Sequence, residues 1–215
     1  MSSTADTYAL LRNLTSPVLA LTTASQGRLN GMILNSAIRA SLIPEKPRVA
    51  VFILKRNFSH DLVLESGAFA LHLLHTESWD LIWELGFHSG RDHDKLERIE
   101  HRIGDGGSPL IEDVYARLDG RVINAMDTGA SACFLGDVLS VERGVRDSLM
   151  TSEHIRDHMP ADWHAIYESN LAAAQEWATG LVGDIHPLIW RDLADEAWPN
   201  TMPGGGCIAN ARALV

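Results

Sequence analysis

The run Lys-Arg-Asn-Phe-Ser-His at positions 55–60 joins two cations to short polar side chains, the groups that an anionic phosphate needs. It follows RVAVFIL at 48–54, a short apolar run typical of a buried strand. Asn57 is a suitable N-cap, so a helix should span residues 58–66 and end at Gly67. Because free N–H groups and positive potential meet at a helix N-terminus, this turn is predicted to cradle a phosphate. An ordinary capped helix with both cations in solvent remains the alternative.

A second segment, residues 28–41, carries amides and hydroxyls where a strand would normally alternate apolar and polar side chains. Asn30, Asn35 and Ser36 interrupt its apolar pattern, and Gly31 indicates a bulge or the close approach of a ligand or another backbone. Such a strand suits a planar heterocycle that presents alternating hydrogen-bond donors and acceptors. A solvated edge strand with a bulge would have the same pattern.

The elements that must position these segments are mainly strands. Six or seven short antiparallel strands with few helices between them favour a closed or nearly closed barrel with peripheral helices over a parallel sheet. Residues 87–109 should form mostly loop, of the kind that often carries function. Strands are expected at 17–23, 28–38, 48–54, 68–74, 114–126, 131–145 and 187–190, and helices at 4–14, 58–66 and 78–85, with turns at 25–27 and 127–129.

The longest helix is expected where the period changes, between residues 147 and 183. Apolar residues recur there every three or four positions from Trp163 to Leu181, which indicates one apolar face. That face would cover the core, cap the functional site or extend a dimer interface. Residues 202–215, which contain a Pro-Gly-Gly-Gly run, are expected to form a tail or arm of a single domain at 1–215.

Composition limits the classes of partner. The chain has 215 residues, enough for one sizeable core, and a formal net charge of −10 at pH 7. That charge repels polyanions, so neither nucleic acid nor a membrane is expected as a partner, and an anionic ligand needs a local cluster of donors. Cys133 and Cys207 lack metal or redox spacing, and no signal or spanning segment is evident, so a reducing, cytoplasmic location is expected.

Other site classes find little support. His88 and His93 share one loop and His154 and His158 lie a helical turn apart, but a metal needs three or four ligands, and no HExxH or Cys/His cluster occurs. We therefore expect no metal site. No Rossmann fingerprint or P-loop follows a strand, and the adjacent residues 59–61, Ser-His-Asp, do not supply triad geometry.

The order and spacing of motifs between residues 19 and 74 resemble the flavin reductase family, whose domain is an FMN-binding split β-barrel of Greek-key-like topology. The matching stretches are NGMILNS at 30–36, SL at 41–42, Pro44, the turn and helix at 55–63, and ESGAFALH at 65–72. Weaker matches follow at 94–96, 107–110, 116–118 and 134–139, and HPLIW at 186–190 is similar to the final strand. The helical stretch at 147–183 would be an insertion relative to compact members.

The resemblance implies an oxidoreductase that binds FMN at a homodimer interface, reduces it with NADH or NADPH, and supplies reduced flavin to a partner oxygenase. The flavin accepts the hydride, so no side chain is assigned as catalytic acid or base. Residues expected beside the ring and ribityl chain are Asn30, Met32, Ile33, Leu34, Asn35 and Ser36, with Ser41 and Leu42 alongside. Those expected to hold the phosphate are Lys55, Arg56, Asn57, Ser59 and His60.

The chain also departs from the family pattern. Ile33 and Asn35 replace a common hydroxyl pair, and Arg39 stands where a small residue is usual. Gly-Ala-Ser at 129–131 replaces a Gly-Asp-His motif whose histidine lies near the nicotinamide, so Ser131 marks the expected nicotinamide side. A flavin-binding protein without nicotinamide turnover is therefore an alternative, as is a split barrel that uses a deazaflavin or heme.

Overall fold

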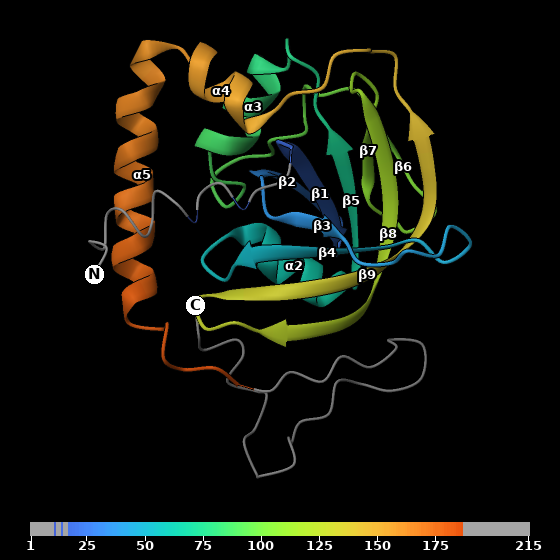
Figure 1. The fold of residues 1–215 in the computed structure, drawn as a ribbon, viewed down its shortest axis with the longest axis horizontal. Coiled ribbons are helices and arrows are strands. Elements are labelled where there is room, and N and C mark those ends of the chain that lie inside the picture. The colour runs from blue at the N-terminus through green and yellow to red at the C-terminus, as the bar shows by residue number, and fades with distance from the viewer. Residues whose placement is uncertain (1–10, 12–13, 15–16, 187–215) are drawn as a thin grey trace.

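A curled seven-stranded antiparallel sheet, with the strand order β2-β1-β5-β8-β9-β4-β3, forms the framework of the molecule (Figure 1). The computed structural model describes residues 11, 14 and 17–186. The mainly β, antiparallel architecture is confirmed. The strands of this sheet are β1 (Leu19–Ser25), β2 (Arg28–Leu34), β3 (Ala37–Arg39), β4 (Arg48–Leu54), β5 (Ala68–Leu73), β8 (Ala116–Asp127) and β9 (Ser131–Arg143), while β6 (His101–Ile103) and β7 (Pro109–Ile111) pair separately.

The strand expected at 28–38 is wrong in one respect, because the chain changes partners at residues 35 and 36. β2 pairs with β1, whereas β3 pairs with β4 at the opposite end of the strand order. The carbonyl of Ser36 accepts a hydrogen bond from the N–H of Phe52, which draws the chain onto β4. The three steps from Leu34 to Ala37 span roughly 11 Å at most, so the two edge strands must approach each other and the sheet must curl.

Four helices surround the described part of the sheet: α2 (Phe58–Ser66), α3 (Trp79–Phe87), α4 (Ser152–His158) and α5 (Ala161–Thr179). Helix α2 matches its expected bounds and ends at Gly67, whose φ of 68° is a left-handed conformation that suits glycine. Helix α3 was expected to end before Gly86 but continues to Phe87. The ring of Phe87 stacks on Trp83 with 5.0 Å between the ring centroids, and this packing favours the two additional helical residues.

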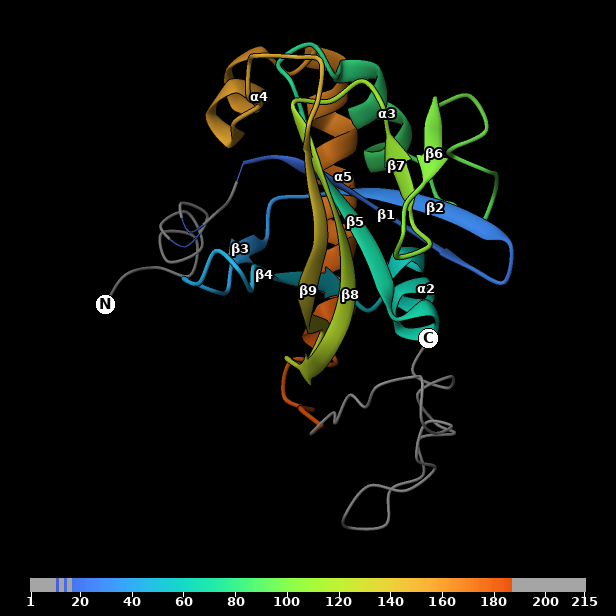
Figure 2. The ribbon, with the colours of Figure 1, turned by 90° about the vertical axis from the view of Figure 1, so that its right-hand side faces the viewer.

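Two apolar clusters form the core. The first fills the barrel and includes Leu21, Ile53, Phe69 and Phe134, all fully buried. The second lies between the barrel and α3 and includes Leu74, Ile82, Leu85, Leu96 and Met150. Helices α3 and α4 lie together at one end of the sheet in both views, so the second cluster closes that end (Figures 1 and 2).

A buried histidine on β5 makes two polar contacts with main-chain groups of the second cluster. Nδ1 of His72 donates to the carbonyl of Ala20 at 3.2 Å, and Nε2 accepts from the N–H of Ile111 at 3.0 Å. Burial lowers the pKa of His72 to about 4, although the hydrogen bond to Ala20 acts in the opposite direction. His72 is therefore neutral and structural at pH 7.

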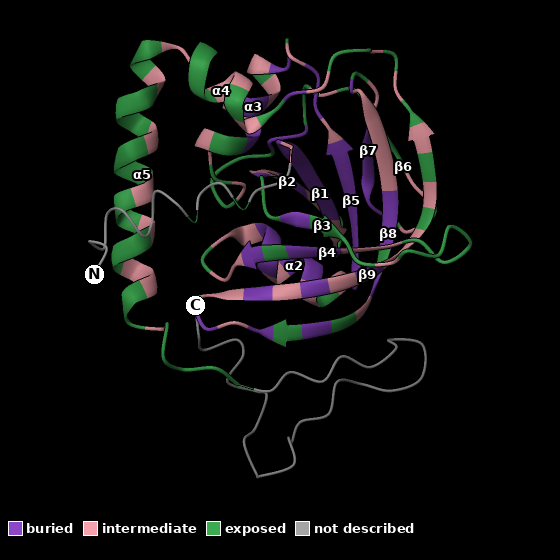
Figure 3. Ribbon diagram, in the orientation of Figure 1, coloured by how far each residue is buried: buried purple, intermediate pink, exposed green. Residues whose placement is uncertain are grey.

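Helix α5 runs along one side of the barrel, and its residues are exposed or half-buried, with none fully buried (Figure 3). Its half-buried positions follow the predicted apolar stripe and include Trp163, Tyr167, Leu171 and Trp177. Trp163 lies 4.8 Å from Trp83, ring to ring, and so anchors the start of α5 on α3. The stripe is in the predicted phase, but the helix does not cover the barrel core.

Several expectations lie outside the described residues. They concern most of the helix at 4–14, the strand at 187–190, Cys207 and the tail at 202–215. Within the part of the chain that the structure describes, no helix combines the length and apolar character needed to cross a membrane.

Candidate functional site

A pocket of about 330 Å³ lies where β2, the N-terminus of α2, the end of α3 and the loop after it meet the middle of α5. This volume is in the range of small-molecule sites. Six of the residues expected to bind cofactor line it: Asn30, Met32, Ile33, Arg56, Asn57 and Ser59. The two polar segments identified in the sequence therefore share one cavity, although residues 30 and 59 lie on different elements.

The charged side chains that line this pocket in the described part of the chain are basic. Arg56, Arg91 and Lys95 belong to the wall, and among the described residues no Asp or Glu lines it. The chain as a whole carries a net charge of −10. The pocket thus concentrates positive charge against the overall field, which is the local arrangement that an anionic ligand requires.

The start of α2 supplies main-chain donors to the same wall. Asn57 has extended backbone angles at the N-cap position, but its side chain makes no capping hydrogen bond. Its Nδ2 lies 3.8 Å from Sδ of Met32 instead. The first N–H groups of a helix have no carbonyl partner within the helix, so those of Phe58 and Ser59 are suited to an anion at this end.

Asn30 brings an incompletely satisfied amide to the pocket wall. It is 2% exposed, and its Nδ2 donates to Oγ of Ser59 at 2.9 Å, whereas its Oδ1 has no hydrogen-bond partner among the described residues. Turning the amide over would exchange the two atoms and leave Nδ2 unpartnered. A β-carbon at Gly90 would lie 1.9 Å from Oδ1, so the close approach of this loop requires glycine. An unpaired buried amide atom favours a polar ligand.

Arg91 ties the loop after α3 to the start of α2. Its guanidinium donates to the carbonyl of Arg56 at 3.1 Å and pairs with Asp61 at 2.8 Å, and it lies over the Phe58 ring. These contacts commit Arg91 to holding the loop in place. The guanidinium of Arg56, in contrast, makes no hydrogen bond or ion pair with other described residues, so it is available to a ligand.

Lys95 forms the buried end of the cationic wall. It is 5% exposed, and its Nζ donates to the carbonyl of Leu85 at 2.7 Å, close to the end of α3. Burial lowers its pKa to about 8, although the charge of Glu84 acts in the opposite direction. The lowered pKa still lies above 7, and the C-terminal end of α3, where Nζ donates to Leu85, is a place that favours a cation.

Two of the residues assigned to the phosphate turn inward from the pocket. Nζ of Lys55 forms a largely buried ion pair with Asp127 at 2.7 Å. Burial raises the pKa of Asp127, but hydrogen bonds from Lys55 and from two main-chain N–H groups outweigh it and leave the pKa below its usual value. His60 is buried, lies 3.1 Å from Asp61 and contacts the Phe134 ring. Neither Lys55 nor His60 lines the pocket.

The remaining assigned residues also lie outside the pocket wall. Leu34 is buried in the barrel core, and Asn35 and Ser36 are exposed at the crossing between β2 and β3. In the loop after β3, Oγ of Ser41 accepts from the N–H of Ile43, and Leu42 is 80% exposed. Ser131 begins β9, and its carbonyl accepts from Thr128. Their assigned roles stay predictions.

Sequence reasoning missed much of the opposite wall. The additional lining residues are Gly31, Leu54, Phe58, Leu85, Gly86, Phe87, His88, Ser89, Gly90, Arg91, Lys95, Asn170 and Ala174. The glycine-punctuated loop after α3 was a signal, because it was expected to carry function. For Asn170 and Ala174 the sequence offered no signal beyond the helical period, because their position at the pocket depends on how α5 is anchored.

Comparison with known proteins places these features in a family context. The family model described as "Flavin reductase like domain" matches residues 11–160. The chain is 32% identical over 135 residues to the high molecular weight rubredoxin of Moorella thermoacetica, covering 62% of this chain and 58% of that protein. It is 30% identical over 124 residues to the ferric-chelate reductase (NAD(P)H) of Archaeoglobus fulgidus, covering 57% and 72%. The match to the rubredoxin thus spans less than two thirds of that relative.

A solved structure has a similar fold. The FMN-binding protein from Thermus thermophilus with bound 1-cyclohex-2-enone aligns with a TM-score of 0.55 at 25% identity. The alignment covers 60% of this chain and 71% of that one.

Proposed function

Because this chain belongs to the family of flavin reductase like domains and has their split β-barrel fold, we propose that it is an NAD(P)H-dependent flavin reductase that binds FMN in the pocket between α2, α3 and α5. The observation that carries the proposal is the cationic, acid-free pocket wall in a chain of net charge −10. FMN combines a dianionic phosphate with a ring whose edge donates and accepts hydrogen bonds. Both parts find complementary groups in this wall.

The residues present fit the two ends of FMN. Arg56 and the first N–H groups of α2 would hold the phosphate by charge-assisted hydrogen bonds. The unpaired amide atom of Asn30 would meet a polar atom of the ring or ribityl chain, since it otherwise stays unsatisfied. Met32, Ile33 and Phe87 supply apolar surface for the ring. Bound flavin would supply the hydride acceptor, and these residues would orient it and exclude water.

NADH or NADPH is the proposed reductant. The relative from Archaeoglobus fulgidus carries NAD(P)H in its name, and this supports the proposal. We retain Ser131 as the proposed marker of the nicotinamide side. Asn35, Ser36, Ser41 and Leu42 are retained as outer parts of the flavin site that a second copy would complete. The proposed flavin roles of Lys55, His60 and Leu34 would require these inward-facing side chains to rearrange when the ligand binds.

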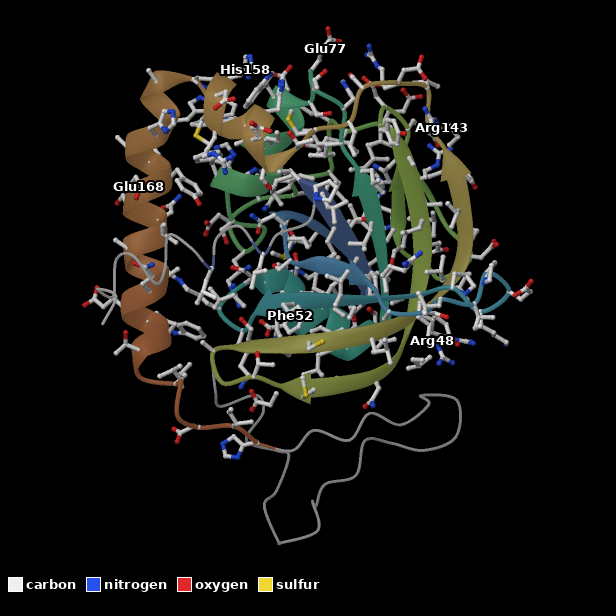
Figure 4. All side chains as sticks on the ribbon, viewed as in Figure 1. Arg48, Phe52, Glu77, Arg143, His158 and Glu168 are labelled. Atoms are coloured by element: carbon white, nitrogen blue, oxygen red, sulfur yellow. The ribbon has the colours of Figure 1, made fainter. Side chains whose placement is uncertain are left out.

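A homodimer is part of the proposal. Large apolar side chains lie exposed near the β3–β4 edge, including Ile38 at 60% and Leu42 at 80% exposure, and Phe52 on β4 faces outward (Figure 4). Covering them with a second copy would bury apolar surface. Sedimentation equilibrium tests the dimer, and a monomer at micromolar concentration would contradict the dimer proposal.

The partner and domain proposals go with the reductase. Reduced flavin would pass to a partner oxygenase. Residues 147–183 would be an insertion, and residues 202–215 would be an arm of the single domain at 1–215.

The reductase proposal is tested by visible spectroscopy and by turnover. Purified protein mixed with FMN should oxidise NADH or NADPH faster than free FMN does, and the bound flavin should lose its visible absorption on anaerobic addition of the nicotinamide. An FMN spectrum that neither nicotinamide changes would exclude the reductase. Absence of any FMN binding would exclude both the reductase and the site.

A flavin-binding protein without nicotinamide turnover is the second candidate. It is favoured by α5, since Asn170 and Ala174 close one side of the pocket that a nicotinamide would otherwise approach. Removal of that obstruction by Trp177→Ala, which loosens α5, would restore nicotinamide oxidation if α5 blocks it. Oxidation by the unmodified protein would exclude this candidate.

A further inference from the structure

Three side chains beside the pocket bring potential metal-ligand atoms together. Glu84 and His88 lie one turn apart at the end of α3, and His93 follows in the next loop. One such atom from each residue lies within 4.8 Å of the other two. Nε2 of His93 is 2.6 Å from Oε1 of Glu84, and Nδ1 of His88 is 3.6 Å from Oε2 of the same carboxylate. The carboxylate thus lies between two imidazole nitrogens.

One of these nitrogens lacks a hydrogen-bond partner. Nδ1 of His88 is inaccessible to solvent and makes no hydrogen bond with the described residues. Its 3.6 Å separation from Glu84 is too long for a hydrogen bond. Two ligands of one tetrahedral ion, each about 2.1 Å from it, lie about 3.4 Å apart. The separation therefore suits a shared ion better than a direct contact.

We propose that Glu84, His88 and His93 bind one divalent transition-metal ion, with Zn²⁺ as the preferred occupant. Two imidazoles and one carboxylate form a ligand set that Zn²⁺ accepts, with a fourth position left for water. His88 and His93 were visible in the sequence as a pair without a third ligand. The end of α3 supplies it, because Glu84 lies in the last turn of the helix, four positions before His88 at its C-cap.

The charged groups around the cluster leave the carboxylate available. The ammonium of Lys95, which is close enough for the charge of Glu84 to raise its pKa, donates to the carbonyl of Leu85 and not to Glu84. Among the described residues, Glu84 makes polar contacts only with His88 and His93. His88 also lines the pocket, so the ion would lie at its wall. The site does not depend on the identity of the pocket's ligand.

Calorimetric titration of the untagged, chelator-treated full chain with Zn²⁺ tests the proposal. We expect one Zn²⁺ per chain. His93→Ala and Glu84→Gln each remove a ligand, so each should weaken binding by more than the roughly 10- to 100-fold typical of outer-shell changes. The matched control is His158→Ala on α4, where Figure 4 labels His158. His154 and His158 are also a helical-turn pair, but no third ligand joins them among the described residues.

A thermal melt with and without Zn²⁺ keeps the test valid if one variant is unstable. Zn²⁺ should raise the melting temperature of the parent chain and of His158→Ala, and should leave that of His93→Ala unchanged, because a ligand stabilises only the state that binds it. Failure of the parent chain to bind Zn²⁺ would overturn the proposal, as would full binding by both His93→Ala and Glu84→Gln. Flavin binding, measured separately, reports on the proposed function and not on the ion.

Discussion

Helices α2 and α5 both contribute to the pocket, but the barrel holds them differently. Four residues of α2 are buried, whereas none of α5 is. Helix α2 follows β4 after a short turn and packs on β1, while α5 is anchored through Trp163 against the aromatic side chains of α3. The phosphate side of the proposed site is therefore fixed by the core. The α5 side, with few buried contacts, should open at a smaller cost in free energy.

The largest expected effect follows from removal of a core ring beneath the α2 side. Phe69 is fully buried in the barrel, and the ring lies so close to β9 that a β-carbon at Gly136 would be 2.7 Å from its Cζ. Phe69→Ala should lower the free energy of unfolding by about 3–5 kcal/mol, because it leaves a cavity in the core. Urea denaturation measures this change. A loss below about 1 kcal/mol would show that the barrel does not carry the stability that we assign to it.

Acidification should weaken the same region by a somewhat smaller amount. The pKa of His72 is lowered from 6.5 to about 4 in the folded chain, so the unfolded chain binds its proton more readily. Stability should therefore fall as the pH decreases from about 6.5 to 4, by about 3 kcal/mol in total from this residue. His72→Gln should reduce the slope of stability against pH in that window. Equal slopes in the two proteins would contradict the assignment.

The smallest effect is expected on the α5 side. Trp177 is half-buried on a helix without buried residues, so Trp177→Ala should cost less than about 1 kcal/mol. Urea denaturation of Trp177→Ala and Phe69→Ala under the same conditions compares the losses in free energy of unfolding directly. A cost equal to that of Phe69→Ala would mean that α5 is as firmly held as α2. A cost that grows with protein concentration would show instead that α5 packs on a second copy.

The two helices also differ in how far the sequence predicts them. Asn57 and Gly67 are local signals, and they mark the bounds of α2 without knowledge of the fold. Partners distant in sequence decide the rest of the site. Lys55 was assigned to the phosphate because it lies beside Arg56, but it pairs with Asp127, 72 positions later in the chain. Local patterns predict capped helices well and say little about which partner a long side chain will choose.

Tertiary packing likewise explains the errors in strands and in the far wall. Residues 28–38 resemble one strand, but hydrogen bonding between Ser36 and Phe52 moves the chain to another edge of the sheet. Gly90 meets Asn30 only after α3 has packed on β2. Neither contact has a periodic signature in the sequence.

The most direct test of the central claim compares the affinities of FMN and riboflavin, which differ by the phosphate alone. Arg56→Ala should weaken FMN binding about 10- to 150-fold, equivalent to about 1.5–3 kcal/mol, because a charge-assisted hydrogen bond is lost. Riboflavin binding should be nearly unchanged. Arg121→Ala, an exposed arginine on β8 outside the pocket wall, is the control and should affect neither ligand. The account would be contradicted if Arg56→Ala weakened the binding of FMN and riboflavin equally, or weakened the binding of neither.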